Sequence, residues 1–362
     1  LAGEAVAPKT VFAAERFAEA GIRHVAGAAA VTIDRAAKRV ALADGTTLPY
    51  DRLLIATGAT ARRLRVPGAD DPRVATLRTH DDAVTIAARL RPGARVAVIG
   101  GGFIGLELAA AATKRGASVT VIEALPRVLA RAVPEAIAET VAARHAAAGT
   151  RIVAAAGVAA LEPDGDGITV VLADGERLVA DLVVAGIGAV PETALGRAAG
   201  LAIDNGIAVD ATLATSDPDI LAAGDCCSFP HPLYAGRRIR LESWRNALDQ
   251  AALAARNLLG AGEAVSAVPW FWSDQHDLTL QIAGLPDEGH AAVRRDLDDA
   301  TFLLFHLAAD GRLVAASGIG PGNAVAKEIR LAEMLIAARA MPDPALLASP
   351  SARLKALLPG RS

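Results

Sequence analysis

The clearest hydrophobic pattern in the chain is an apolar run over residues 95–99 that leads into a glycine-rich turn and an apolar helical segment. Short apolar runs bounded by glycine are typical of strands buried on both faces of a parallel sheet. A second such run covers 118–122, and others end in glycine near residues 58, 186 and 224. Because buried strands alternate with helical segments, the pattern predicts an α/β fold.

The turn after the first run contains a spaced set of glycines. In "RVAVIGGGFIGLELA", Gly100, Gly102 and Gly105 fit the pattern G-x-G-x-x-G. The first glycine permits a tight turn, the second lets backbone approach a pyrophosphate, and the third lets helix and strand pack closely. We expect the phosphates at the helix N-terminus, with Phe103 and Ile104 also lining the site.

The second apolar strand ends in Glu123, 18 residues after Gly105. A carboxylate at this place can accept hydrogen bonds from both ribose hydroxyls and repels a 2'-phosphate, which predicts NAD rather than NADP. Arg127 is the nearest basic residue in sequence and could reach a 2'-phosphate if its loop moved. The alternative is an ordinary glycine-rich turn with a surface glutamate.

Two further segments, far apart in the chain, each contain a predicted buried strand that ends in a glycine turn. In "DGTTLPYDRLLIATGA" a buried strand ends at Thr57-Gly58, and in "TSDPDILAAGDC" another ends at Gly224-Asp225. A carboxylate at the carboxyl end of a strand lies where parallel sheets bind their ligands. The whole NAD unit lies between these segments, so the order predicts one nucleotide-binding domain inserted into another.

Composition excludes several classes of protein. With 362 residues, 52% hydrophobic and 21% charged, the chain is globular and long enough for more than one domain. A net charge of -3 gives no general attraction to nucleic acid or anionic membranes. The apolar run 96–112 contains several glycines and Glu107, so we expect a buried strand and helix rather than a membrane span.

The spacing of the cysteines and histidines excludes several kinds of redox and metal site. Cys226 and Cys227 are adjacent, so they form neither a disulfide framework nor a C-x-x-C redox pair. With no signal peptide pattern at the start of the sequence, this predicts a cytoplasmic location. The seven histidines show no metal-ligand spacing, so we predict no metal site.

Taken together, these segments resemble the FAD-dependent, NADH-dependent ferredoxin reductases of the putidaredoxin reductase and biphenyl dioxygenase reductase kind. The resemblance covers essentially the whole chain and rests on "LLIATGA", "LRTHDDA", "VIGGGFIGLELA", "VIEALPRVLAR", "VVAGIGAVPET", "ILAAGDC", "LESWRNALDQA" and "PWFWSDQHDLTLQIAGL". It implies FAD and NAD(H) as cofactors, and a [2Fe-2S] ferredoxin as partner in a monooxygenase or dioxygenase system. It further implies a monomer or weak dimer.

The resemblance also implies the domain order. Two Rossmann-like nucleotide domains, with the NAD domain inserted in the FAD domain, precede a C-terminal α+β domain. The expected boundaries are 1–77 and 204–262 for the FAD domain, 78–203 for the NAD domain and 263–362 for the C-terminal domain. Members of the family begin with an earlier G-x-G-x-x-G unit, so we expect this sequence to lack about fifty N-terminal residues of a family member.

The resemblance assigns FAD contacts to seven residues. Asp225 is expected at the ribityl chain, Arg78 at the phosphates, and Trp244 at a helix N-terminus beside the pyrimidine edge of the flavin. A strand-capping Asp225 and a core-packed Trp244 are the alternatives. The adenine side is expected to involve Ala30, Thr57, Gly58 and Ala59.

Two candidate catalytic residues follow from the same resemblance. Glu107, one turn into the helix after Gly105, is expected at the nicotinamide, with Gly188 beside the cofactor; the alternative is a solvated glutamate. Trp270 and Trp272 share one face of a strand. Trp272 is expected near the flavin where an iron-sulfur protein docks, or else as one of two core tryptophans. Arginines that could form a docking patch for an acidic ferredoxin, or simply a solvated surface, stand at 237, 238, 240, 245, 294 and 295.

Two other functions remain open from the sequence. One is an NADH-dependent disulfide or peroxide reductase of the same architecture, although the C-terminal region lacks the His-Glu pair of disulfide reductases. The other is a redox-sensing protein that binds NADH and turns over slowly. Reduction of a ferredoxin would separate all three.

Overall fold

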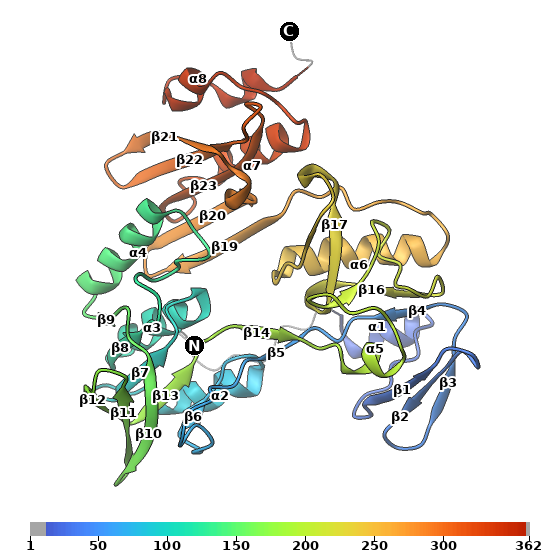
Figure 1. Ribbon diagram of the computed structural model, residues 1–362, viewed down its shortest axis with the longest axis horizontal. Helices are drawn as coiled ribbons and strands as arrows, with labels where there is room; N and C mark the ends of the chain where they lie inside the picture. Colours follow the sequence, from blue (N-terminus) through green and yellow to red (C-terminus); the bar gives the residue numbers. More distant parts are fainter. Residues whose placement is uncertain (1–11, 360–362) are drawn as a thin grey trace. The chain divides into compact units, whose positions relative to one another are not determined.

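A computed structural model describes residues 12–359 of the chain, which form two compact units (Figure 1). The first comprises Thr60–Val190 and the segment from Ser266 onward, and the second comprises the described residues up to Ala59 together with Pro191–Val265. The chain passes between the units along two short paired strands, β5 (Ala59–Ala61) and β14 (Ala189–Pro191). The first unit therefore interrupts the second, as expected for an inserted nucleotide domain.

A five-stranded sheet with parallel pairing throughout forms the base of the first unit. Its strands run in the order β6-β13-β7-β8-β9. The strands are β6 (Val74–Ala75), β7 (Arg95–Ile99), β8 (Ser118–Ile122), β9 (Arg151–Val153) and β13 (Leu182–Ala185), and the helices are α2 (His80–Arg89), α3 (Phe103–Lys114) and α4 (Glu135–Ala147).

The local sequence explains why these strands and helices form. In β7 the four residues after Arg95 are all buried, which is why the strand reads as a continuous apolar run. Helix α3 has alanines on its buried face, including the fully buried Ala109 and Ala112, so it can lie close to the sheet. Helix α2 begins with a capping box between Thr79 and Asp82.

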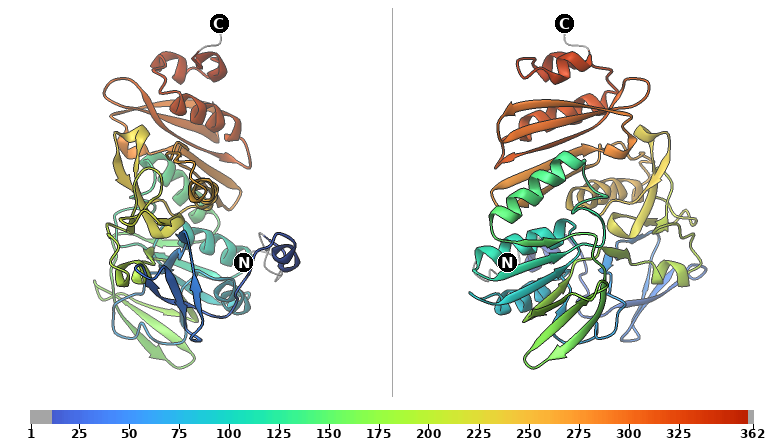
Figure 2. Two further views of the ribbon diagram at one scale, coloured as in Figure 1. Left: turned by 90° about the vertical axis from the view of Figure 1, so that its right-hand side faces the viewer. Right: turned by 60° about the vertical axis from the view of Figure 1, so that its left-hand side comes forward.

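Two antiparallel sheets complete the first unit. The smaller one is formed by β10 (Val158–Asp164), β11 (Gly167–Leu172) and β12 (Arg177–Ala180). The C-terminal sheet has the order β19-β20-β23-β22-β21, and α7 packs against it (Figure 2). Its elements are β19 (Trp270–Gln275), β20 (Leu278–Gly284), β21 (Ala291–Asp298), β22 (Thr301–Leu307), β23 (Leu313–Pro321), α7 (Ala326–Ala337) and α8 (Pro344–Ala348).

The parallel sheet and the C-terminal sheet share one hydrophobic core. Leu106 of α3 and Ile137 of α4 belong to the same buried cluster as Leu280, Phe302 and Ile319 of the C-terminal sheet. The C-terminal segment is therefore packed on the helices of the nucleotide fold and is not a loosely attached module. The predicted boundaries at 78–203 and 263–362 stay predictions.

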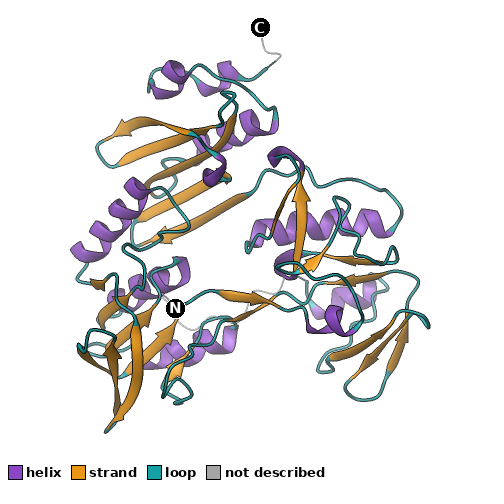
Figure 3. Cartoon of the chain, viewed as in Figure 1, coloured by secondary structure: helices purple, strands orange, loops and turns teal. Residues whose placement is uncertain are grey.

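The described residues of the second unit form small sheets together with α1, α5 and α6 (Figure 3). Strands β1–β3 form an antiparallel sheet, β4 pairs in parallel with β16, and β15, β17 and β18 form a third sheet. The elements are α1 (Ala14–Glu19), β1 (Ala30–Asp34), β2 (Arg39–Leu42), β3 (Thr47–Pro49), β4 (Leu53–Ile55), α5 (Ala194–Ala198), β15 (Ile207–Ala208), β16 (Ile220–Ala222), β17 (Cys227–His231), β18 (Arg237–Ile239) and α6 (Trp244–Leu258).

Two expectations concern the extent of the chain. The stretch that precedes residue 12, on which the expectation of an absent N-terminal unit rests, lies outside the described residues. None of the helices between residues 12 and 359 is long and apolar enough to cross a bilayer.

Candidate functional site

The glycine turn between β7 and α3 is packed as its spacing predicts. A Cβ at Gly105 would lie 2.1 Å from the Gly100 carbonyl oxygen, and one at Gly100 would lie 2.5 Å from the Gly186 oxygen. These positions therefore exclude any side chain. A Cβ at Gly102, the N-cap of α3, would meet no described atom within 4 Å. The backbone is consequently open where a pyrophosphate is expected to approach the helix N-terminus.

A cavity of about 370 Å³ opens beside this turn. Glu123, at the end of β8, lines it and is held by two backbone donors: its Oε2 accepts from the Gly101 N–H at 2.7 Å and its Oε1 from the Leu125 N–H at 2.8 Å. Each oxygen of an ionised carboxylate can accept more than one hydrogen bond, so the group can also bind ribose hydroxyls. Gly188, with a φ of +99°, lines the same cavity.

Two arginines near this cavity differ in their surroundings. Arg127 donates to the backbone oxygens of Val128, Ala130 and Val133, so its guanidinium is used to hold its own loop. Arg131 is exposed and lines the cavity. The basic side chain in a position to reach a 2'-phosphate is therefore Arg131, which the sequence analysis did not identify.

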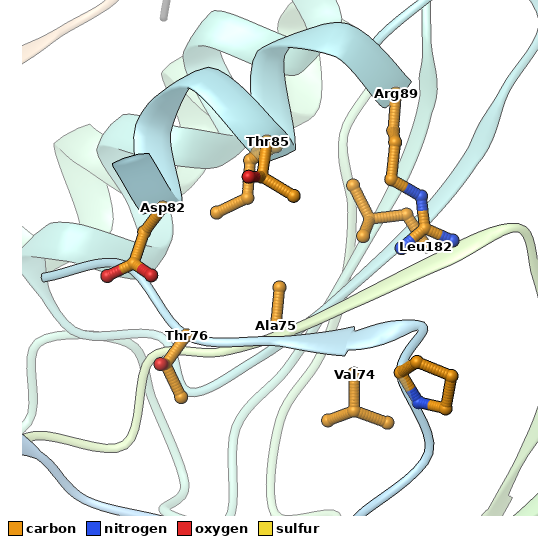
Figure 4. A pocket seen from close by; sticks show the side chains of 9 residues that line it. Val74, Ala75, Thr76, Asp82, Thr85, Arg89 and Leu182 are labelled. Atoms are coloured by element: carbon orange, nitrogen blue, oxygen red, sulfur yellow. The ribbon is translucent and has the colours of Figure 1, made fainter. Parts of the chain in front are cut away.

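A smaller hollow of about 240 Å³ lies between α2 and β6 (Figure 4). Its polar lining includes Asp82, whose carboxylate caps α2, and Arg89, which donates to the Asp181 carbonyl oxygen at 2.9 Å. These groups serve local structure, and the hollow does not include the glycine turn.

Strand β19 has two chemically different faces. On one face the rings of Trp270 and Trp272 stack with centroids 5.4 Å apart, and Trp272 is 39% exposed, which excludes a core role. On the opposite face Phe271 packs against Phe103 of α3, with ring centroids 4.4 Å apart. The next residue on that face, Ser273, is buried.

Glu107 lies one turn after Phe103 and meets this second face of β19. The Ser273 hydroxyl donates to its Oε1 at 2.5 Å. Desolvation raises the pKa of the Glu107 carboxyl above its ordinary value and the nearby Asp274 carboxylate acts in the same direction, while the Ser273 hydrogen bond opposes them. Glu107 is therefore not simply a solvated surface residue, although it keeps an exposed side.

In the second unit, two predicted FAD contacts lie at one sheet edge. Strands β4 and β16 pair in parallel, with Ile55 opposite Ala222. Thr57 follows β4, and Asp225 lies in the short 3-10 turn after β16, so both come after the carboxyl ends of neighbouring strands. This is the edge at which parallel sheets bind their ligands.

The remaining predicted FAD residues are more dispersed. Trp244 begins α6 and is 62% exposed, so it is not a core residue. Gln250 on the same helix accepts from the Gly224 N–H at 2.7 Å, which ties α6 to the turn that carries Asp225. Gly58, with a φ of +69°, and Ala59 follow Thr57, and Ala30 begins β1, whereas Arg78 belongs to the other compact unit.

Comparison with known proteins places this geometry in a family. Residues 3–251 match the family described as pyridine nucleotide-disulphide oxidoreductase, and residues 270–358 match the family described as reductase C-terminal. The chain belongs to the pyridine nucleotide-disulphide oxidoreductase family. As a member it is an oxidoreductase of mixed α/β fold with a C-terminal reductase domain, and its cofactors are FAD and NAD(H).

Individual members of the family are similar over most of their length. The ferredoxin--NAD(+) reductase component of the anthranilate 1,2-dioxygenase system of Burkholderia cepacia is 45% identical over 327 residues, which are 90% of this chain and 79% of that protein. The ferredoxin reductase for the CYP199A2 system of Rhodopseudomonas palustris is 37% identical with a TM-score of 0.90, covering 96% of this chain and 84% of that one.

A third family member was solved with its partner. The reductase in a covalent putidaredoxin reductase-putidaredoxin complex is 36% identical to this chain. The match has a TM-score of 0.90 and covers 96% of this chain and 84% of that one. The resemblance inferred from sequence motifs is therefore confirmed at the level of family and fold.

The docking patch of arginines is not supported by their contacts. Arg295 is 1% exposed, so the prediction is wrong for this residue. Arg238 donates to the Ser228 and Val209 carbonyl oxygens, and Arg240 pairs with Glu242. Arg238, Arg240 and Arg295 therefore stabilise local structure, whereas the role of Arg237, Arg245 and Arg294 in docking stays a prediction. Arginine spacing in sequence carries no signal for such backbone partners.

Two buried histidines make the stability of this family member pH-dependent. Burial lowers the pKa of His145 and of His306 from 6.5 to about 4. The unfolded chain therefore binds protons that the folded chain does not, so stability is present above about pH 6.5 and is lost as the pH falls toward 4. Between pH 7 and 5 we expect a loss of about 2 kcal/mol for each histidine.

Urea unfolding at several pH values measures this loss. The variant His306→Gln, which cannot titrate, should show a shallower decline with acidification than the wild type. Equal slopes for the two proteins would contradict the assignment of His306.

Proposed function

We propose that this chain passes electrons from NADH through FAD to a [2Fe-2S] ferredoxin that serves a monooxygenase or dioxygenase. When bound, FAD would supply the redox chemistry, namely acceptance of a hydride from NADH and transfer of single electrons to the partner. The protein's own residues bind the nucleotides, orient them and present an apolar surface to the partner. No side chain is required as a general acid or base.

The proposed binding of NADH rests on the glycine turn and on Glu123. The exclusion of side chains at Gly100 and Gly105, and the open backbone at Gly102, suit a pyrophosphate at the start of α3. Glu123, fixed by two backbone donors, binds the adenosine ribose. Phe103 and Ile104 follow the turn on α3, and Glu107 orients the nicotinamide end of the same nucleotide.

The observation that carries the proposal is the two-faced strand β19. One face bonds Glu107 of the nucleotide fold through Ser273, and the other exposes Trp272. Trp272 stacks on Trp270, so the strand presents a pair of tryptophan rings, and tryptophan is enriched among the residues that carry most of the binding energy at interfaces. Strand β19 thus joins the nucleotide site to the surface that meets the ferredoxin. The named partners of the relatives, ferredoxin and putidaredoxin, support the same partner for this chain.

The FAD contacts proposed for the second unit are the strand-end residues Thr57, Gly58 and Asp225, the helix start at Trp244, and Ala30 and Ala59. Arg78, which belongs to the first unit, is proposed as a contact to the FAD phosphates. A helix N-terminus stabilises nearby negative charge, and α6 is long enough to do so. We also propose a cytoplasmic location and a monomer or weak dimer.

Replacing Trp272 by alanine tests the partner surface. Because the side chain is exposed, its loss should cost little stability but should slow ferredoxin reduction about tenfold or more by removing an interface anchor. Reduction of the flavin by NADH should stay nearly unchanged. Stopped-flow mixing of NADH-reduced protein with a [2Fe-2S] ferredoxin measures both steps.

Leu259→Ala is the matched control, since Leu259 is 91% exposed and lies elsewhere, just after α6. It should leave both steps intact. Equal slowing by both variants would argue against Trp272 as a docking residue. Rapid oxidation by a disulfide or peroxide, without oxidation by ferredoxin, would overturn the proposed function itself.

A further inference from the structure

The inner face of β19 carries an unbroken row of hydrogen-bonded side chains between α4 and α3. His145 Nε2 lies 2.9 Å from Gln275 Oε1, and Gln275 Nε2 donates to Ser273 Oγ at 2.8 Å. Ser273 Oγ in turn donates to Glu107 Oε1 at 2.5 Å. His145, Gln275 and Ser273 are all buried, so solvent does not compete for the bonds among these three, whereas Glu107 at the end of the row has an exposed side.

The chemistry of each group fixes the direction of these bonds. The Gln275 carbonyl oxygen can only accept, so His145 must donate to it through Nε2–H. The Gln275 amide nitrogen can only donate, so the Ser273 oxygen accepts from it. The Ser273 proton is then left for Glu107, and every donor in the row points toward that carboxylate.

The state of His145 is consistent with this direction. With the proton on Nε2, the other ring nitrogen, Nδ1, is bare, and it has no hydrogen-bond partner within residues 12–359. Burial keeps the ring neutral at ordinary pH by lowering its pKa to about 4. A neutral ring with a single donor is what the row requires at its far end.

We propose that Ser273, Gln275 and His145 are positioning residues that hold Glu107 as an oriented hydrogen-bond acceptor, so that the C-terminal segment completes the nicotinamide end of the nucleotide site. The inference deepens the proposed function and rests on it for the role of Glu107. Glu107 itself is the group that would touch the nucleotide. The other three act through it.

The charged groups around Glu107 do not by themselves favour the ionised form of its carboxylate. Asp274 on β19 is a like charge, and the first turn of α3 holds no acidic residue. On α4, Arg144 is paired with Asp277, and the pKa of His276 at the hairpin is lowered mainly by burial. The Ser273 hydroxyl is therefore the main described donor that favours the ionised carboxylate, together with the Asp274 backbone.

The test is the titration of Glu107 in the full chain as purified, followed by carbon NMR of labelled carboxyl groups, with Glu107→Gln to assign the signal. Ser273→Ala removes the donor and should raise the pKa of Glu107 by about one unit. Ser273→Thr keeps a hydroxyl and should restore the wild-type value. Gln275→Leu should raise it as well, by less, because the Ser273 proton is no longer directed.

Thr279→Ala is the matched control, since Thr279 donates to the Asp274 carboxylate at 2.7 Å in the neighbouring strand but is not part of the row. It should leave the Glu107 titration unchanged. An unchanged pKa in Ser273→Ala, or an equal shift in Thr279→Ala, would overturn the inference. If Ser273→Ala does not fold, Ser273→Cys, which donates only weakly, gives the same test.

A second measurement tests whether this row of hydrogen bonds affects catalysis. The pH profile of kcat/KM for NADH with ferricyanide as acceptor should move in the same direction in Ser273→Ala and return in Ser273→Thr. The NMR titration needs no nucleotide, so it tests the row independently. Absence of any NADH oxidation by the wild type would overturn the proposed function and leave the titration result standing.

Discussion

Replacing Arg295 by methionine should lower the free energy of unfolding of its unit by about 3–5 kcal/mol. The guanidinium is buried and binds the segment 346–352 and a carboxylate: Nε donates to Leu347 O at 2.7 Å, Nη2 to Leu346 O at 2.7 Å, and Nη1 to Ala352 O and to Glu328 Oε2, both at 3.3 Å. Methionine fills part of the space but leaves these carbonyl oxygens without a donor. Urea unfolding measures the change.

The neighbouring residue provides the control. Arg294 is an exposed arginine that pairs with Asp296 and lies over the Phe302 ring, 3.9 Å from its centroid. Arg294→Met should cost about 1 kcal/mol or less, because exposed ion pairs contribute little. A similar loss in both variants would mean that the buried contacts of Arg295 do not stabilise the C-terminal segment.

Replacing Glu123 by alanine should abolish most of the preference for NADH over NADPH. In the proposed NADH site the Glu123 carboxylate accepts ribose hydroxyls and repels a 2'-phosphate, and we expect these two effects together to contribute on the order of 2–4 kcal/mol, or roughly thirty- to a thousand-fold in specificity. Removal of the carboxylate also releases the Gly101 and Leu125 N–H groups that it now occupies, and free backbone donors favour a phosphate. The ratio of kcat/KM for the two nucleotides, with an artificial acceptor, measures the effect.

The variant Arg131→Ala tests the contribution of Arg131 separately from that of Glu123. Because Arg131 is the exposed basic residue there, its loss should reduce the residual use of NADPH and leave the use of NADH nearly unchanged. Near-equal use of both nucleotides by the wild type would contradict the role of Glu123. So would a Glu123→Ala variant that keeps the full preference.

The sequence predicted those parts of the fold in which local pattern and tertiary structure agree. The strands at 95–99 and 118–122 have the predicted bounds, because each is a buried apolar run with a turn at its end. The glycine spacing predicted the tight turn at Gly100, whose φ is +106°, and the close packing at Gly105 for the same local reason. The helix start expected at Trp244 is also found, as the first residue of α6.

Contacts between distant segments could not be read from local pattern. Period-two alternation correctly put Trp270 and Trp272 on one face, yet it does not say which face is exposed. Ser273 meets Glu107 across 166 positions, and a single serine carries no sequence signal for that partner. Arg295 was misassigned because an arginine that binds backbone carbonyls looks, in sequence, like any surface arginine.

Because inward and outward side chains alternate along β19, insertions and deletions before this strand are restricted during evolution. Phe271, Ser273 and Gln275, the second, fourth and sixth residues of the strand, share the inward face, while Trp272 is exposed between them. Gain or loss of a single residue in the segment before Trp270 would exchange the two sets if the strand kept its place in the sheet. The tryptophan would enter the polar row, and the serine would be exposed. Changes of length there are therefore tolerable only in steps of two residues or where the loop itself absorbs them, so the row bonded to Glu107 and the exposed tryptophan face are inherited together.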